Sequence, residues 1–439
     1  MGPDVRQPAP KPKRVYYGWT IITTLAVAEI TSWGILYYAF TVFLEPMHAT
    51  LGWSRVSITG AFSLALVLSG VVGIPLGRWL DRRGPRLLMS AGSCVATLLL
   101  LAWSFVGSLA AFYLIWAGLG ITMAAVLYEP AFWVVSAWFN QRRGQALTVL
   151  TLVAGLASVI YVPLAGWLVV VQGWRHTLLT LAVLLAVGTI PLHALVLRRR
   201  PADLGLLPDG ETARTDTRDD YASGATVHVA GVTPRVALRS ASFWLVTAAF
   251  VLSTLCTGVV FVYLVPYLIT RGYPAHVAAT AVGVIGLIAL PGRLVLTPLG
   301  DWLPRGRLTA GLFLSQTVAV LILLVGRGDL GVIGFVVLFG AGFGAISPAR
   351  AALVAEYFGP AHFGSINGMV ALALNLARAI APVGAGIVIE ATGGYQPTWW
   401  ILAALSALSA LAAVLAERKY ARAVPPLRRV RAKDSRHRE

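Results

Sequence analysis

The chain has 439 residues, of which 57% are hydrophobic and only 12% are charged, and its mean hydropathy is +0.76. Soluble domains have about 45–50% apolar and about 25% charged residues, so this composition excludes an ordinary soluble protein and indicates an integral membrane protein. The net charge of +17 would suit nucleic-acid binding, but the placement of the basic residues argues against that class.

Twelve apolar segments are long enough to cross a bilayer, which takes about 20 mostly apolar residues. We therefore predict an all-α membrane protein with twelve transmembrane helices. The predicted spans are 18–44, 54–80, 85–106, 108–138, 143–171, 174–197, 240–270, 274–303, 307–326, 330–357, 361–391 and 395–417. An even number of spans places both termini on one side of the membrane.

The basic residues outside these spans are distributed asymmetrically. They lie in the two tails (1–17 and 418–439) and in the loops after even-numbered spans, and the exceptions are Arg55, Arg175, Arg271 and Arg327. By the positive-inside rule, both termini of this multi-pass protein are predicted to be cytoplasmic, which places the protein in the cytoplasmic membrane. The basic tail 418–439 is interpreted as a topology and lipid-surface feature and not as a nucleic-acid-binding segment.

A single long polar interval, 198–239, separates a six-helix bundle at 18–197 from a second at 240–417. The halves resemble each other. PLGRWLDRRGPR from Pro75 corresponds to PLGDWLPRGR from Pro298, and WFNQRRGQA from Trp138 corresponds to YFGPAHFGS from Tyr357. Such parallel repeats predict two pseudo-symmetric bundles with a substrate site between them near the membrane midplane.

The loop after the second span carries a motif with a physical logic. It combines glycines that allow helices to approach, a carboxylate that can bind helix ends, and basic residues. Its residues are Gly77, Asp81, Arg82, Gly84 and Arg86. This loop resembles the signature of the major facilitator superfamily, which implies an alternating-access transporter in which the motif acts in gating. The alternative is that these charges only set the topology.

Other segments resemble a subgroup of that superfamily, the bacterial monocarboxylate-transporter-like and oxalate/formate-antiporter-like members. They include YGW at Tyr17, GWSR at Gly52, GWR at Gly173, ADLGLLPDG at Ala202, LVPYL at Leu264, GRL at Gly292 and FGSINGM at Phe363. The resemblance implies uptake or exchange of a small organic carboxylate, a monocarboxylate or short dicarboxylate, with proton symport or anion exchange.

The chain also departs from the subgroup at three positions. Tyr263 stands where many relatives have His, and Ala289 stands one turn before Arg293, where some animal carriers have a carboxylate. In the second copy of the loop motif, Pro304 aligns with Asp81. These differences direct the search for a proton-coupling group elsewhere.

Six ionisable residues lie within the predicted spans: Glu29, Glu129, Arg293, Arg350, Arg378 and Glu390. A charge at the bilayer centre is costly, so such residues usually face a cavity or a partner. Arg293 is about ten residues, or ~15 Å, from its helix end. In the family that the chain resembles, the arginine at the GRL position binds the substrate carboxylate. Arg378 is predicted to be a second anion ligand or, alternatively, the partner of Glu29 or Glu129.

The remaining candidates surround these arginines. The predicted substrate-contacting residues are Tyr37, Tyr128, Tyr263 and Asn375, and the predicted proton-coupling residues are Glu129 and Glu29. The buried glutamates belong to the first half and the buried arginines to the second, which suggests an electrostatic latch between the halves. Arg350 is interpreted as structurally paired, and Glu390 as solvated.

No nucleotide-binding, metal-binding or catalytic motif is present, so the sequence predicts no enzyme activity, no cofactor and no metal. Cys94 and Cys256 are interpreted as packing residues. The predicted partners are a small organic anion, protons and membrane lipids. The sequence leaves the oligomeric state open, and a monomer is compatible with it. Two other functions remain open: export of an amphiphilic compound, and a non-transporting membrane sensor that signals through its basic tail. Against export, YLIWAGLG from Tyr113 lacks the arginine of many proton-driven exporters.

Overall fold

The protein is described by a computed structural model that covers residues 16–210, 231–326 and 328–423. Most of the predicted tails and the middle of the predicted linker lie outside these residues. Eleven apolar helical segments in the described part are long enough to cross a membrane. One of them, Arg143–Leu195, crosses twice, because Gly173 interrupts it with φ 76° and ψ 164°. The prediction of twelve transmembrane helices is therefore confirmed.

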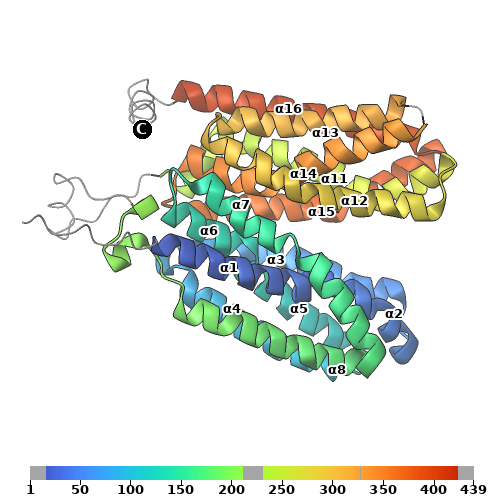
Figure 1. Cartoon of the computed structure of the whole chain (residues 1–439), viewed down its shortest axis with the longest axis horizontal. Helices are drawn as coiled ribbons and strands as arrows, with labels where there is room; N and C mark the ends of the chain where they lie inside the picture. The colour runs from blue at the N-terminus through green and yellow to red at the C-terminus, as the bar shows by residue number, and fades with distance from the viewer. Residues whose placement is uncertain (1–15, 211–230, 327, 424–439) are drawn as a thin grey trace, which may run out of the picture.

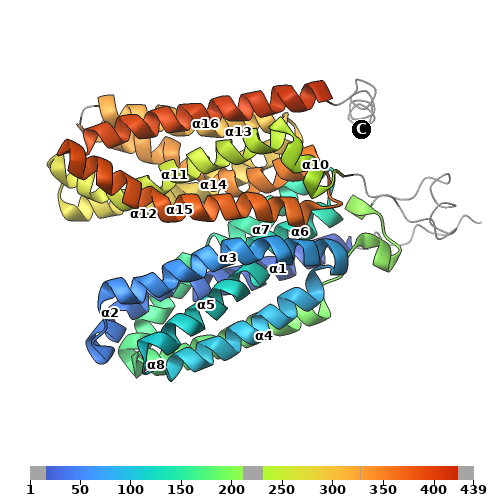
Figure 2. The same cartoon turned by 180° about the vertical axis from the view of Figure 1, so that it is seen from behind.

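The helices form two bundles, one below the other in Figure 1 and again in the reverse view of Figure 2. The first contains α1 (Tyr17–Trp33), a π-helical turn (Gly34–Tyr38), α2 (Phe40–Leu51), α3 (Arg55–Arg83), α4 (Pro85–Ser104), α5 (Leu109–Val126), α6 (Tyr128–Trp138), α7 (Arg143–Ala154) and α8 (Ala157–Leu195). The second contains α11 (Ala241–Thr270), α12 (Ala275–Leu296), α13 (Arg305–Val325), α14 (Gly328–Phe358), α15 (Phe363–Thr392) and α16 (Gln396–Ala423).

The segment between the bundles contains two 3-10 turns, η2 (Pro201–Leu204) and η3 (Pro208–Gly210), and the short helix α10 (Pro234–Arg239). This segment, the start of α1 and the end of α16 all lie at one end of the molecule, at the left in Figure 1. We call it the terminal end.

Two predicted spans are broken at identifiable residues. The predicted span 108–138 divides at Leu127, whose φ of −89° and ψ of −161° are extended, and Pro130 follows within the first turn of α6. Proline lacks the N–H that would continue the helical hydrogen bonds. The predicted span 274–303 ends early at Leu296 and continues as the 3-10 turn η4 (Pro298–Asp301).

Each half has its own apolar core, and a third core joins them at the terminal end. The joint core contains Trp133 and Trp138 of the first half together with Phe358 and Phe363 of the second, all of them buried. Burial of apolar area is the main force that holds such surfaces together. The halves are therefore packed against each other at the terminal end.

Candidate functional site

At the terminal end, Asp81 of α3 binds the start of α15 in the opposite half. The N–H groups of Gly364 and Ser365 donate to its carboxylate, each at 2.9 Å, and the Ser365 hydroxyl donates at 2.6 Å. The Trp133 indole N–H donates from within the first half at 2.9 Å. Asp81 is 8% exposed, so these charge-assisted bonds form away from bulk water. A carboxylate at a helix N-terminus is also favoured by the helix dipole.

The other residues of this motif shape the end of α3. Gly84 ends the helix with φ 79°, in the left-handed region that favours glycine. Arg86 donates to the carbonyl of Ala194 at 2.6 Å, and Arg82 is exposed. Arg199 donates to the backbone carbonyl of Asp81 at 3.1 Å. In the described residues, none of the motif's arginines contacts the Asp81 carboxylate.

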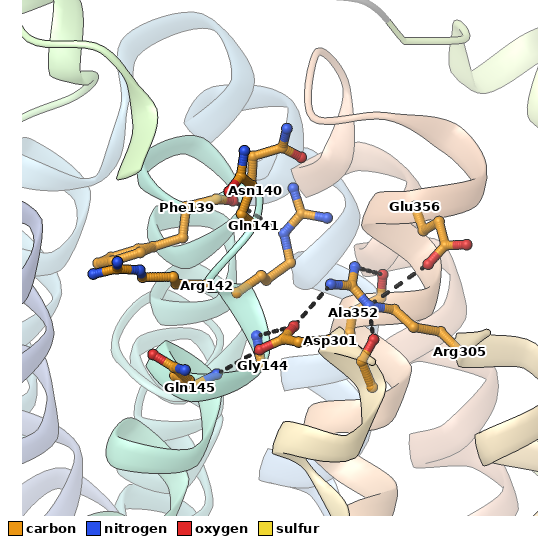
Figure 3. Close-up of polar contacts among 12 residues, drawn as sticks. Phe139, Asn140, Gln141, Arg142, Gly144, Gln145, Asp301, Arg305, Ala352 and Glu356 are labelled. Carbon is orange, nitrogen blue, oxygen red and sulfur yellow. Dashed lines mark hydrogen bonds and ion pairs between the residues drawn. The ribbon is translucent and has the colours of Figure 1, made fainter. Parts of the chain in front are cut away.

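The second half returns an equivalent contact through Asp301 (Figure 3). Its carboxylate accepts hydrogen bonds from the N–H groups of Gly144, at 3.0 Å, and Gln145, at 3.2 Å, at the start of α7. Arg305 donates to Asp301 at 3.2 Å and pairs with Glu356 at 3.6 Å. The alignment of Pro304 with Asp81 stands, and the contact comes instead from Asp301, three residues earlier in the turn η4, whose carboxylate reaches the opposite half.

Between these contacts and the membrane midplane, α3 and α15 meet along small residues. A Cβ atom at Gly77 would lie 2.1 Å from the carbonyl oxygen of Gly364, and one at Gly368 would lie 2.7 Å from the carbonyl oxygen of Gly73. Asn375 packs against Gly70 one step further along. We call this contact line, from Gly77 to Gly70 on α3, the glycine seam. It lets the two backbones approach closely across the boundary between the halves.

Deeper in the protein, an ion pair joins the halves. Arg350 of α14 donates to Glu129 of α6 at 2.8 Å and to the side chain of Asn367 at 3.1 Å, and Asn367 in turn donates to Glu129. Arg350 is 5% exposed. The sequence-nearest acidic residue, Glu356, pairs with Arg305 instead. The predicted alternative pairing of Arg378 with Glu129 is not present.

Glu29 of α1 has an unusual environment. It is 0% exposed, and neither carboxylate oxygen has a hydrogen-bond partner in the described part of the chain. Trp33 is its nearest polar neighbour, and Tyr128 and Glu129 lie within electrostatic range. An ionised carboxylate without a cation or donor is costly at such a position, so the pocket suits a neutral, protonated side chain.

Arg293 of α12 reaches across the boundary between the halves. It donates to the carbonyl of Gly344 at 2.8 Å and to the carbonyl of Thr151 in α7 of the opposite half. Its guanidinium lies beside the Tyr128 hydroxyl. Among the described residues, no carboxylate forms an ion pair with it.

Arg378 of α15 is likewise unpaired by any carboxylate of the described chain. It donates to the side-chain carbonyl of Asn375 at 2.8 Å. The side chain is exposed although it belongs to the middle of a transmembrane helix. Tyr37 and Tyr38 of the opposite half lie within its electrostatic range. Arg378 therefore faces the space between the halves.

Tyr37 and Tyr38 enter this space from the π-helical turn, which is closed by the N–H of Ala39 and the carbonyl of Gly34 at 2.9 Å. Such turns are rare and occur often at functional sites. Trp33 packs against Tyr128 with ring centroids 4.8 Å apart, which completes an aromatic wall opposite the arginines. Tyr263 of α11 donates its hydroxyl to the carbonyl of Pro382 at 2.9 Å, one turn after Arg378 on α15.

Sequence reasoning missed three residues of this region. Tyr38 lies near both Arg293 and Arg378 but was not distinguished from its neighbour Tyr37. Asn367 had a signal, since it is a polar residue inside an apolar span, in FGSINGM. Asp301 had one as well, since the PLG of its motif copy is followed directly by an acidic residue.

Two bundles related by a repeat, joined at one end and carrying arginines in the space between them, define a secondary transporter. A family model of the Major Facilitator Superfamily matches residues 24–344 and 329–437. The chain belongs to this family, whose members are membrane transporters and not enzymes.

Relatives and solved structures agree with this assignment. Monocarboxylate transporter 13 of Bos taurus is 24% identical over 398 residues, covering 88% of this chain and 86% of the relative. A probable L-galactonate transporter of Escherichia coli is 29% identical over 147 residues, 33% of this chain and 32% of that protein. The E. coli fucose:proton symporter FucP has the same fold, with a TM-score of 0.68 at 15% identity over 91% of this chain and 99% of that one.

Proposed function

We propose that the protein transports a small organic carboxylate by alternating access of its two halves. The observation that carries this proposal is the pair Arg293 and Arg378. Both lie at membrane depth, both adjoin the space between the halves, and neither is neutralised by a carboxylate of the described chain. Arg350, by contrast, has Glu129 as its counterion.

Unneutralised cations in this position favour an anionic ligand. A guanidinium offers paired, planar donors that match a carboxylate and keeps its charge at all physiological pH values. Arg293 and Arg378 use only part of their donors on Gly344, Thr151 and Asn375, which leaves N–H groups for a substrate. Two arginines favour a dianion, or a monoanion that carries a second polar group, and Tyr37, Tyr38 and Tyr128 can accommodate an organic body.

The names of two relatives support this substrate class. One is called a monocarboxylate transporter and the other a probable L-galactonate transporter, and both names denote organic acids. No specific observation favours export of an amphiphilic compound or a purely sensory role.

The same proposal includes an orientation. The basic residues cluster in the tails and in the loops at the terminal end, so the positive-inside rule places this end in the cytoplasm of a cell with the protein in its cytoplasmic membrane. The contacts of Asp81 and Asp301 then close the cytoplasmic side. The structure corresponds, in this proposal, to an outward-facing state of bundles 18–197 and 240–417.

We assign proton coupling to Glu29 in preference to Glu129. Glu129 is occupied by Arg350 and Asn367, whereas Glu29 has no cationic partner in the described part of the chain and is within electrostatic range of Tyr128, which adjoins Arg293. A proton on Glu29 and an anion on Arg293 would then both lie within electrostatic range of the same residue, Tyr128.

Counterflow of labelled mono- and dicarboxylates in proteoliposomes tests the proposal. We expect saturable exchange in the wild type and at least a tenfold loss in Arg293→Gln and in Arg378→Gln. The control is Arg307→Gln, because that side chain is 79% exposed and belongs to the surface. Binding without exchange would support the sensor, and exchange that survives both arginine variants would overturn the proposed site.

The proton assignment is tested in the same vesicles with an imposed pH gradient. Glu29→Gln should abolish proton-driven accumulation and retain exchange. Glu129→Gln should reduce the exchange rate but keep accumulation coupled to the gradient. The reverse pattern would assign the proton to Glu129, and coupled accumulation in both variants would exclude both glutamates.

A further inference from the structure

The segment ADLGLLPDG, which follows the first bundle, has a structural role that transport alone does not explain. Its Asp209 lies in the turn η3 and accepts hydrogen bonds from three consecutive backbone N–H groups of the loop between α6 and α7. The donors are Asn140 at 2.8 Å, Gln141 at 2.8 Å and Arg142 at 3.1 Å. The described start of the segment is thus fixed to this loop.

The same loop leads directly into the helix start that Asp301 binds from the opposite half. Asp209 takes the N–H groups of residues 140–142, and Asp301 takes those of Gly144 and Gln145. Two carboxylates therefore share one short stretch of backbone. Asp209 approaches it from the first half's own connection, and Asp301 approaches it from the second half, as Figure 3 shows for the second contact.

The described end of the connection makes a related contact in the second half. The N–H of Val232 donates to the carbonyl of Phe358 at 2.9 Å, and Gly231 lies against Ala361. Residues 358–362 lead into the start of α15, which Asp81 binds from the first half. Both loops that precede the bound helix starts are thus supported by the connection between the bundles.

The conformation of Asp209 shows that this contact is specified. Its φ of 59° lies in the left-handed region, and it is the only described non-glycine residue with a positive φ. Aspartate adopts this region more readily than most residues, but the conformation remains unfavourable and persists where surrounding contacts impose it. The three N–H donors supply those contacts.

We propose that Asp209 is a positioning residue for the gate at the terminal end. By the gate we mean the contacts of Asp81 with the start of α15 and of Asp301 with the start of α7. It holds the loop at residues 139–142 in the form that presents the N–H groups of Gly144 and Gln145 to Asp301. When Asp301 withdraws during opening, Asp209 stays bound to the loop. The loop therefore keeps its closed-state conformation, and Asp301 can bind it again without a rearrangement of the loop backbone. Loss of Asp209 is expected to favour the open gate for any substrate, because Asp209 contacts neither Arg293 nor Arg378 in the described part of the chain.

The experiment measures the gate directly. Spin labels are placed at Leu87→Cys on α4 and Arg307→Cys on α13, two exposed positions in opposite halves, in a Cys94→Ala background that leaves the buried Cys256. Distance distributions are recorded for the full chain in lipid nanodiscs. We expect Asp209→Ala to increase the long-distance, open population at least threefold over the wild type.

Two further variants keep the result interpretable. Asp209→Asn retains the left-handed preference and one acceptor oxygen, and it should fall between the wild type and Asp209→Ala. Asp203→Ala is the matched control, since among the described residues Asp203 accepts from the N–H of Arg200 in its own segment and from none in the loop at 139–142, and it should leave the distribution unchanged. A wild-type distribution in folded Asp209→Asn and Asp209→Ala would overturn the proposal. An equal shift in Asp203→Ala would also overturn it, since the effect would then be general to the segment.

Discussion

The two carboxylates that cross between the halves do the same task in different surroundings. Asp81 is buried and is bound by uncharged donors only: two backbone N–H groups, a hydroxyl and an indole. Asp301 has two backbone N–H groups and shares Arg305 with Glu356. When Asp301 leaves, Arg305 stays paired with Glu356, so little is lost. When Asp81 leaves, no second acid among the described residues accepts the hydrogen bonds of its donors. The first contact is therefore the stronger and the second the more easily exchanged.

The largest expected effect comes from Asp81→Asn. The amide keeps the shape of the side chain but loses the charge and turns one acceptor into a donor that faces N–H groups. A hydrogen bond to a charged group contributes about 1.5–3 kcal/mol, so loss of two would shift the gate by about 3 kcal/mol or more, roughly a hundredfold in population. The spin-label pair at residues 87 and 307 measures this. A shift smaller than that of Asp301→Asn would reverse the ranking of the two contacts.

Next in size is the replacement of the glycine in each PLG sequence. A Cβ at Gly77 would meet the backbone of Gly364 at 2.1 Å, while at Gly300 the nearest atom, in the Leu308 side chain, is 3.4 Å away. Overpacking costs about 1–3 kcal/mol, and α3 and α15 would have to separate. Gly77→Ala should open the gate about tenfold or more, and Gly300→Ala should leave it within about twofold. Equal effects of Gly77→Ala and Gly300→Ala would show that the close approach of α3 and α15 at the glycine seam does not hold the gate closed.

The smallest of the three effects is expected for Asp301→Asn. Arg305 retains Glu356 and the carbonyl of Gly300, so the variant loses about 1 kcal/mol, roughly fivefold in the closed population. The double variant Asp301→Asn with Glu356→Gln should exceed the sum of the two single effects, because Arg305 then loses both acids. Strict additivity, measured by the same distances, would mean that Arg305 does not link them.

The fold followed from hydropathy and the repeat, because only apolar helices of sufficient length can satisfy their backbone in a membrane. The breaks inside the spans could not be predicted from hydropathy. Leu127 and the π-helical turn at Gly34–Tyr38 are surrounded by apolar residues, so a window of about 20 residues does not register them. The early end of α12 at Leu296 did have a local signal, since Pro298 and Asp301 follow it, but the hydropathy of the span extended past them.

The candidate site was predictable to a lesser degree. Arg293 and Arg378 could be selected because a charge at membrane depth is energetically costly and therefore indicates a functional or structural role. The proposal for an anion site rests on these two residues. The partner of Glu129 could not be selected, since Arg350 and Arg378 both lie in the second half and only packing determines which one approaches. Asp301 was not predicted because the two motif copies were aligned residue by residue, although their backbones differ. In the second copy a 3-10 turn follows α12 and directs Asp301, three residues before the aligned position, toward α7.

The glycine seam also has a consequence for the anion site. Asn375, which orients Arg378 through a hydrogen bond, packs directly on Gly70 at the inner end of the seam, while Gly77 at its outer end adjoins Asp81's contact with α15. Both ends belong to the same continuous helix pair. In the proposed transport cycle, a rotation that lifts α15 from α3 at the terminal end would carry Arg378 away from the tyrosines of the first half, so that exit of the proposed anion and weakening of its binding would be one event.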